Sequence, residues 1–306
     1  MKILVTGGAG FIGSHINKLL LDLDHQVVVV DNLSKGHQEL IDTRAQFINA
    51  DINDQEALIH ALVGVDWVIH MAGFIEIPLS VKDPIGFAQN NVMGSISLLE
   101  AMKKAGVKKI VFSSTAAVYG DPKTLPLTED APLRATNPYG ASKIAVEQFL
   151  SSYHSLQGFD VVILRYFNPY GPNELHQPET HLIPNLIKAA LKGEELPVYW
   201  KGEQVRDFIY VEDLAQAHID VLDLSGFNVF NVGVEKGVKV NDAVKTLGSV
   251  LEKDLKVKDL GVREGDVTAN YASSKLLEET CGWRAKVDLE EGLKRTIEWF
   301  KNNQKN

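Results

Sequence analysis

The feature that most constrains the fold is a series of short, unbroken apolar runs that alternate with helical patterns in the first half of the chain. The runs are rich in β-branched residues and apolar on both faces, as is typical of strands inside a parallel sheet. They occur at 3–7, 26–31, 46–51, 67–73, 109–114 and 161–168, with helical patterns at 11–24, 54–63, 87–105 and 138–157. This alternation predicts an α/β fold with a doubly wound parallel sheet.

The second half of the chain has a different residue pattern, with less regular alternation of strand and helix signals. After Asn168, the stretch NPYGPNELHQPETHLIP contains four prolines and predicts a loop. The elements expected beyond it are a helix at 182–192, a strand at 196–200 and an amphipathic helix from Leu289 to about Phe300. We therefore expect a sheet domain over 1–170 and a smaller α/β lobe over 171–306, which returns in part to the sheet near 206–233.

The first apolar run ends in GGAGFIGSH, where Gly7, Gly10 and Gly13 are spaced three apart. A glycine turn between a strand and a helix lets backbone N–H groups approach a pyrophosphate at the helix N-terminus, where the helix dipole favours negative charge. The spacing differs from the G-x-G-x-x-G fingerprint, but the physical arrangement is the same. No Lys-Ser or Lys-Thr pair follows, which disfavours a P-loop. The turn predicts a dinucleotide site.

Two acidic residues end the next strands. Asp31 can accept hydrogen bonds from the adenosine ribose and would repel a 2′-phosphate, so it favours NAD over NADP. Its alternative is a strand-end residue that starts the turn DNLSKG. Asp51 and Ile52 could border the adenine, although Asp51 could instead cap the helix at 54–63.

A phenol and an ammonium stand together in NPYGASK, where Tyr139 and Lys143 are four residues apart on one helix face. The fifth strand ends in SSTAAVYG, which carries Ser113 and Thr115 to the carboxyl edge of the sheet, where ligands of such folds bind. A Tyr-x-x-x-Lys match alone is weak evidence. Its coincidence with a dinucleotide turn predicts a catalytic site in which a nearby cation favours the phenolate.

Composition excludes several classes of function. The net charge of −9 argues against nucleic acid as a partner. The chain has one cysteine, so an internal disulfide is impossible, and no Cys/His spacing predicts a metal. No apolar run reaches membrane-spanning length and the start does not resemble a signal peptide, so a cytoplasmic protein without membrane contact is expected.

These segments resemble the extended short-chain dehydrogenases/reductases, and within them the UDP-glucose 4-epimerases. The motifs that carry the resemblance are VTGGAGFIGSH, DNLS, HMAG, NNVMGS, SSTAAVYGD, NPYGASK, LRYFNPYG, LPVYW, VRDFIYVEDLA, REGD and LEEGLKRTIEWF. The resemblance implies a Rossmann domain with bound NAD and an isomerase that epimerises a nucleotide sugar through a 4-keto sugar. Tyr139 would be the base, Lys143 would lower its pKa and hold the nicotinamide ribose, and Thr115 would align the sugar oxygen.

By the same resemblance, further residues are assigned to the two ligands. Those implied to line the cofactor are Gly7, Gly10, Phe11, Ile12, Gly13, Asp31, Asn32, Asp51, Ile52, Met71, Ala72, Gly73, Asn90, Ser113, Tyr139, Lys143 and Phe167. Those implied to bind substrate are Thr115, Asn168, His181, Leu182, Tyr199, Arg206, Arg263, Asp266 and Asn270. Plain alternatives remain open: core packing for Met71, Phe167 and Tyr199, an Arg206–Asp207 surface pair, and a solvated turn at REGD.

Two positions depart from the epimerase pattern. His181 stands where an Asn often precedes the Leu of the LIP stretch, which leaves the phosphate contact open. Near it, Glu174, His176 and Glu179 invite a metal interpretation, but the spacing matches no recognised site and we predict none. Asn270 stands where a Tyr accompanies strict use of UDP-glucose and UDP-galactose, so we expect room for N-acetylated sugars.

The principal rival is a sugar-nucleotide 4,6-dehydratase. Those enzymes place an Asp–Glu pair directly after the Thr, whereas this chain has Ala116 and Ala117, and a methyl group cannot transfer a proton. A decarboxylase, a 4-reductase and a non-catalytic NAD sensor stay open as alternatives. The resemblance also implies a homodimer formed through the helices at 87–105 and 138–157.

Overall fold

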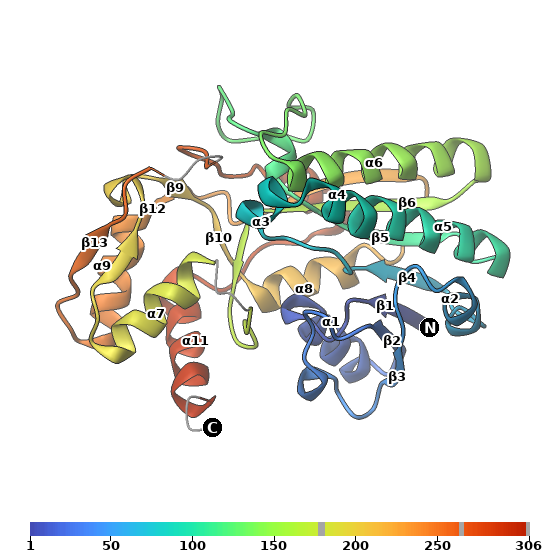
Figure 1. The fold of residues 1–306 in the computed structure, drawn as a ribbon, viewed down its shortest axis with the longest axis horizontal. Helices are drawn as coiled ribbons and strands as arrows, with labels where there is room; N and C mark the ends of the chain where they lie inside the picture. Colours follow the sequence, from blue (N-terminus) through green and yellow to red (C-terminus); the bar gives the residue numbers. More distant parts are fainter. Residues whose placement is uncertain (177–180, 263–265, 304–306) are drawn as a thin grey trace.

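The computed structural model describes residues 1–176, 181–262 and 266–303, and its centre is a parallel sheet of seven strands (Figure 1). The strand order is β11-β6-β5-β4-β1-β2-β3. The strands are β1 (Lys2–Thr6), β2 (Gln26–Asp31), β3 (Gln46–Asn49), β4 (Trp67–His70), β5 (Lys109–Thr115), β6 (Asp160–Tyr166) and β11 (Phe227–Val232). The reversal of strand order at β1 is that of a Rossmann fold, which confirms the predicted doubly wound sheet.

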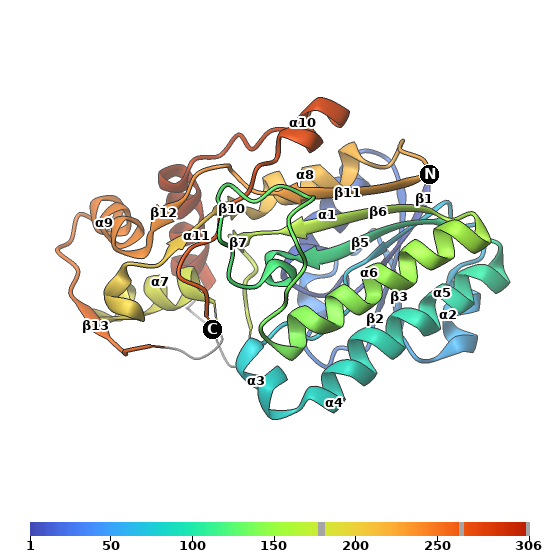
Figure 2. The same ribbon diagram turned by 90° about the horizontal axis from the view of Figure 1, so that it is seen from above.

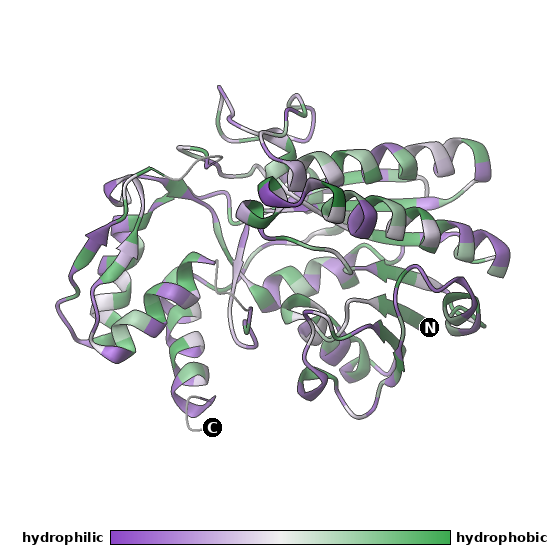
Figure 3. Cartoon of the chain, viewed as in Figure 1, coloured by the Kyte–Doolittle hydropathy of each residue, from purple (hydrophilic) through white to green (hydrophobic). Residues whose placement is uncertain are grey.

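Helices cover both faces of this sheet (Figures 1 and 2). Alternate residues of β1 enter different cores, because successive side chains of a strand point to opposite faces: Ile3 and Val5 enter one core and Leu4 the other. The helices of the first face are α1 (Phe11–Asp22), α8 (Val211–Asp220) and α10 (Lys275–Cys281). Those of the second face are α2 (Gln55–Ala61), α5 (Gly94–Ala105) and α6 (Pro138–Gln157). Figure 3 shows the strands as hydrophobic and the helices as amphipathic, as burial on one side only requires.

The helix predicted at 87–105 is built from three pieces. They are α4 (Pro84–Phe87), the π-helical segment η2 (Ala88–Met93) and α5, and the short helix α3 (Ile77–Lys82) precedes them. Within η2, Asn91 holds the loop after β4, because its side chain binds both backbone groups of Phe74 and also Ser142 of α6. A single π turn of this kind is frequent near functional sites.

The smaller lobe has its own hydrophobic core, which lies to one side of the sheet in Figure 1. Its main elements are α7 (Leu182–Lys192), β8 (Leu196–Val198), α9 (Val240–Leu251), β13 (Val257–Asp259) and α11 (Leu289–Asn303). Two strand pairs form separate two-stranded sheets: β7 (Asn168–Tyr170) with β10 (Phe208–Tyr210), and β9 (Val205–Arg206) with β12 (Val238–Lys239). Short helical turns complete the chain at η1 (Gln38–Leu40), η3 (Ala116–Tyr119) and η4 (Trp200–Gly202).

The chain returns from this lobe to the sheet with α8 and β11, and later with α10. Helix α8 packs on the α1 side of the sheet, and β11 then pairs with the whole length of β6 as the seventh strand. Residues 211–232 are therefore part of the large domain in space, within the stretch where the return was expected. The division of the chain at residue 170 stays a prediction. Among the described residues, no helix has both the length and the hydropathy needed to cross a membrane.

Candidate active site

A cavity of about 730 Å³ opens at the carboxyl ends of β1, β2, β4 and β5 and extends to the smaller lobe. This is where a doubly wound sheet binds its ligands. The predicted cofactor residues that line it are Gly7, Gly10, Phe11, Ile12, Gly13, Asp31, Asn32, Ile52, Met71, Ala72, Gly73, Asn90, Ser113, Tyr139 and Phe167. The predicted substrate residues that line it are Thr115, Asn168, His181, Leu182, Tyr199, Arg206, Asp266 and Asn270.

Two of the predicted residues that the structure describes, Asp51 and Lys143, are not in that wall. Asp51 is exposed, and its carboxylate accepts from the backbone of Asn53 and the side chain of Asn32. Its alternative role as a helix cap is wrong, because Asp54 caps α2 by accepting from Ala57. Lys143 lies buried behind the wall, and Arg263 falls outside the described residues.

The glycine turn is shaped by close backbone packing. Gly7 has a φ of +69°, and a Cβ there would lie 2.7 Å from the backbone nitrogen of Ala72. A Cβ on Gly13 would lie 2.6 Å from the carbonyl oxygen of Gly7. Helix α1 starts from Gly10 without a side-chain cap, so the first N–H groups of the helix face the cavity uncovered by side-chain oxygen. A turn of this kind provides backbone donors for an anionic group.

Asp31 lies at the end of β2, beside that turn. Its two carboxylate oxygens accept from the backbone nitrogens of Leu33, at 2.8 Å, and Ala9, at 3.0 Å. Burial nevertheless raises its pKa above the usual range for Asp. These contacts fix the carboxylate at the cavity wall while lone pairs remain for further donors such as ribose hydroxyls.

The start of α6 places the predicted catalytic pair, Tyr139 and Lys143. Asn137 caps the helix by accepting from Gly140 at 2.9 Å, and Pro138 occupies the first helical position. Tyr139 follows directly and is buried at the cavity wall. One turn later, Lys143 donates from Nζ to the carbonyl oxygen of Ser113 at 2.7 Å. The helix thus joins the end of β5 at the residues that the sequence singled out.

The electrostatics of Tyr139 correct one expectation. Lys143 was expected to lower the phenol's pKa, but burial raises the pKa of Tyr139 to about 12, and a hydrogen bond with Thr115 acts in the opposite direction. Burial also lowers the pKa of Lys143 to about 8. The physical reason is desolvation, which penalises both charged forms in the protein alone. The ammonium is engaged with Ser113, so the phenolate needs a further positive charge close by.

Two polar side chains at the predicted substrate end of the cavity have hydrogen-bond acceptors that no described residue satisfies. The side-chain oxygens of Asn168 and Asn270 are buried and have no hydrogen-bond partner among the described residues. A buried amide oxygen of this kind is costly unless a ligand satisfies it. Both residues line the cavity, so they fit the substrate contacts predicted for them.

The predicted diphosphate contact Arg206 is 9% exposed and lines the same region. Its guanidinium donates to the carbonyl oxygens of Val205 and Val267, both at 2.9 Å. The alternative of an Arg206–Asp207 surface pair is wrong, because Asp207 is fully buried and accepts from the backbone of Val234 and Ala272. Asp266 accepts from Gln204 at 3.2 Å.

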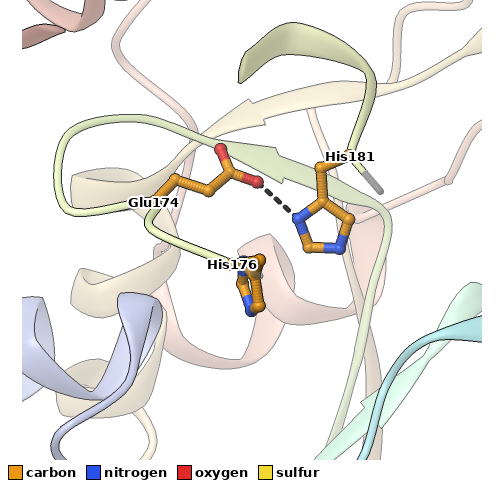
Figure 4. Close-up of side chains that lie close together, drawn as sticks. All are labelled: Glu174, His176 and His181. Carbon is orange, nitrogen blue, oxygen red and sulfur yellow. Dashed lines mark hydrogen bonds and ion pairs between the residues drawn. The ribbon is translucent and has the colours of Figure 1, made fainter. Parts of the chain in front are cut away.

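The structure brings Glu174, His176 and His181 together, each offering one metal-ligating atom within 4.8 Å of the others (Figure 4). Nδ1 of His181 and Oε1 of Glu174 are 2.5 Å apart and hydrogen-bonded. Burial lowers the pKa of His176 to about 3, which keeps that imidazole neutral. Glu179 lies outside the described residues, and the absence of a metal stays a prediction.

Sequence reasoning missed one ion pair at the cavity. Lys35, in the loop after β2, contacts Glu76, in the loop after β4, at 2.7 Å. Because β1 lies between β2 and β4, this pair bridges the loops on either side of the glycine turn. A basic residue four after Asp31 was visible in the sequence, but its partner, 41 residues away, was not.

Comparison with known proteins decides the family. Residues 3–233 match the NAD dependent epimerase/dehydratase family. The chain belongs to this family. A Bacillus subtilis relative named UDP-glucose 4-epimerase is 38% identical, with 99% of this chain and 98% of the relative covered. The family's cofactor is NAD, as the sequence predicted.

Solved structures of the family agree. A Thermotoga maritima UDP-glucose 4-epimerase with UDP-glucose is 36% identical, with a TM-score of 0.96 and all of both chains covered. A Methanobrevibacter ruminantium UDP-N-acetylglucosamine 4-epimerase in complex with UDP-N-acetylmuramic acid is 38% identical, with a TM-score of 0.93 and 98% of each chain covered. A Streptomyces venezuelae dTDP-glucose 4,6-dehydratase with NAD and TYD is 32% identical, also at a TM-score of 0.93, covering 99% of this chain and 98% of its own. Overall similarity therefore does not separate the reactions of this epimerase/dehydratase family, and the site residues must do so.

The residues present fit NAD. The close backbone packing around Gly7 and Gly13 admits no Cβ and so sets the shape of the turn, and the start of α1, which has no side-chain cap, would supply backbone donors to a pyrophosphate. Asp31 provides the acceptor for ribose hydroxyls and disfavours a 2′-phosphate. In this family member the glycine turn, Asp31 and Lys143 would hold the cofactor.

Proposed function

We propose that this protein epimerises a nucleotide sugar at C4, interconverting UDP-glucose and UDP-galactose, with UDP-GlcNAc and UDP-GalNAc as further substrates. The single observation that carries the proposal is the convergence of Tyr139 and Thr115 at the wall of the cavity that the glycine turn also lines, with Lys143 buried directly behind them. The relatives that are named 4-epimerases over nearly the whole chain support the same reaction.

Bound NAD would supply a reversible hydride acceptor for C4 of the sugar, and its oxidised nicotinamide would supply positive charge near the buried phenol of Tyr139. Tyr139 takes the proton from the 4-hydroxyl through Oη and gives it back after the sugar has turned. Thr115, which hydrogen-bonds Tyr139, orients the oxygen that reacts. Lys143 adds positive charge behind the phenol while Ser113 holds its ammonium in place.

Proton transfer beyond C4 has no group to perform it directly after Thr115. Ala116 and Ala117 line the cavity there, so neither residue can remove a C5 proton or protonate a C6 hydroxyl. The dehydratase reaction is therefore disfavoured despite the similar fold. The retention of Tyr139 and Lys143 speaks against a sensor that only binds NAD, because binding needs no base.

The substrate contacts that we propose are those that line the lobe side of the cavity. Asn168 and Asn270 offer unsatisfied oxygens, Arg206 a cation and His181 an imidazole, while Leu182, Tyr199 and Asp266 border the nucleotide. Arg263 keeps its predicted diphosphate role as part of the proposal. Asn270 is smaller than Tyr, which leaves space for an N-acetyl group on the sugar.

A homodimer is proposed through the helices at 87–105 and 138–157. Helices α4, η2 and α6 are in contact, and apolar side chains stay exposed on them and on the neighbouring α3. These are Leu79, Val81, Ile85, Met93 and Phe149, which are 39–70% exposed. Several exposed apolar side chains on neighbouring helices favour an interface there. A dimeric mass by light scattering is expected, and the cytoplasmic location stays a prediction.

The test is incubation of the purified protein with UDP-galactose, followed by proton NMR of the anomeric signals. UDP-glucose should form without added nicotinamide nucleotide, because the family's NAD returns to its starting state after each turnover. Formation of a 4-keto-6-deoxy sugar would instead support a dehydratase. Absence of any product across UDP- and dTDP-sugars, with NAD bound, would favour the sensor.

A further inference from the structure

One helical turn after Lys143, α6 contributes to a buried ion pair that the proposed mechanism does not use. Glu147 of α6 and Arg165 of β6 are 3% and 5% exposed. Arg165 donates from Nη2 to Oε2 of Glu147 at 2.7 Å and from Nε to Oε1 at 3.1 Å. Two apolar side chains could fill this space without the cost of removing two charges from water, so the charges require another explanation.

The position of Glu147 on α6 explains why the buried charges are present. Tyr139, Lys143 and Glu147 follow at intervals of four residues, which places them on one face of α6. Three consecutive residues of β5 hold this face. Thr115 bonds Tyr139, the carbonyl oxygen of Ser113 accepts from Lys143 at 2.7 Å, and Ser114 donates to Oε1 of Glu147 at 2.5 Å.

Arg165 extends the contact to the loop that follows the catalytic threonine. Its Nη1 donates to Oη of Tyr119 at 2.9 Å and to the carbonyl oxygen of Glu129 at 3.0 Å. Tyr119 in turn donates to Asn231 of β11 at 2.6 Å. The pair is therefore fixed from β5, β6, β11 and the loop at once, and it cannot shift without moving α6.

We propose that Glu147 is a positioning residue for catalysis, which keeps Lys143 protonated and holds α6 in register with β5 through Ser114 and Arg165. The inference rests on the proposed function, since it concerns the groups that perform that reaction. The charges around Lys143 support it. Burial lowers the pKa of Lys143, and the carboxylate of Glu147 is the charged group that acts in the opposite direction. Without it, the ammonium would lose its proton nearer to neutral pH.

The experiment compares Glu147→Gln with the double variant Glu147→Met, Arg165→Met. The single variant strands Arg165 without its partner and could unfold, whereas paired apolar replacements of a buried ion pair are commonly tolerated. Glu147→Asp keeps the charge and serves as the conservative variant. Val146→Ala, a neighbouring core truncation on α6, is the matched control for loss of helix packing.

We measure kcat for UDP-galactose as a function of pH. In Glu147→Gln and in the double variant, which both lack the carboxylate, the alkaline limb of this profile should move to lower pH by about one unit, with KM little changed. Glu147→Asp should restore the wild-type limb, and Val146→Ala should lower stability without moving it. The ε-carbon NMR signal of Lys143, assigned by its loss in Lys143→Arg, should titrate at correspondingly lower pH whether or not the protein turns over.

A double variant that folds and keeps both the wild-type limb and the wild-type titration of Lys143 would overturn the inference, and Glu147 would be purely structural. An inactive wild-type protein would count against the proposed function alone, because the NMR titration of Lys143 still tests the role of Glu147.

Discussion

Replacing Gly7 by Ala should destabilise the protein far more than the same change at Gly64. Both glycines have a φ of +69°, where an L-residue is strained by about 1 kcal/mol. Around Gly64, a Cβ would meet nothing within 4 Å. At Gly7, it would lie 2.7 Å from the nitrogen and 2.8 Å from the Cα of Ala72, which are backbone atoms that cannot turn aside.

The difference between the two variants isolates the close contact. Loss of unfolded-state entropy favours Ala equally at both positions and cancels. Forcing an extra carbon into packed backbone costs about 1–3 kcal/mol. We therefore expect Gly7→Ala to lower the free energy of unfolding by about 1–3 kcal/mol more than Gly64→Ala does.

Urea denaturation followed by circular dichroism measures both changes, first on nucleotide-free protein and then with saturating NAD. The midpoint should rise with NAD in wild type and in Gly64→Ala, because ligand binds the folded state. That rise should be lost in Gly7→Ala, in which the turn must open to admit the methyl group. Equal losses of stability in the two variants, or an undiminished NAD effect in Gly7→Ala, would refute the packing argument.

Three further outcomes are expected. Tyr139→Phe should lower kcat by at least about 100-fold, because it removes the proton acceptor, while NAD stays bound; near-normal turnover would remove Tyr139 from the mechanism. Asn270→Tyr should suppress turnover of UDP-GalNAc while sparing UDP-galactose. Unchanged rates on both substrates would refute the idea that the size of residue 270 decides whether an N-acetyl group fits. Burial lowers the pKa of His70 to about 3 and of His218 to about 4. In the unfolded chain both imidazoles have a pKa of about 6.5, so below that pH they bind protons that the folded protein does not bind. Burial lowers the pKa of His176 to about 3, so it adds to this effect. Stability should fall by about 3 kcal/mol from pH 7.5 to 5.5, after partial compensation by Asp207, whose pKa burial raises to about 6; a flat free energy of unfolding over that window would contradict this.

Much of the fold could be predicted because buried parallel strands and glycine turns leave local signatures. The apolar runs fell on all of the first six strands of the sheet, and the helix at 138–157 has the predicted bounds. The π-helical segment η2 within the helix at 87–105 was not predictable, because Asn91 in it contacts Phe74 and Ser142, which lie in distant parts of the chain.

The candidate site was predictable where spacing within one element carried the information, as for Tyr139 and Lys143. Glu147 extends the same spacing by one turn, so a further step of four residues could have found it. Its partner Arg165 gave no such signal, since β6 reads as an ordinary buried strand. The direction of the Tyr139 pKa could not be predicted either, because desolvation depends on how the whole cavity closes around the phenol.

The late return of β11 to the sheet has a consequence for biosynthesis. Until residue 232 has left the ribosome, the outer edge of β6 has no neighbour and the face over α1 has no cover from α8. A nascent chain of 170 residues would therefore show an open, strongly apolar strand edge, which is the kind of surface that recruits other chains. The protein is expected to depend on rapid completion of synthesis, or on a holding chaperone, before its nucleotide half can close.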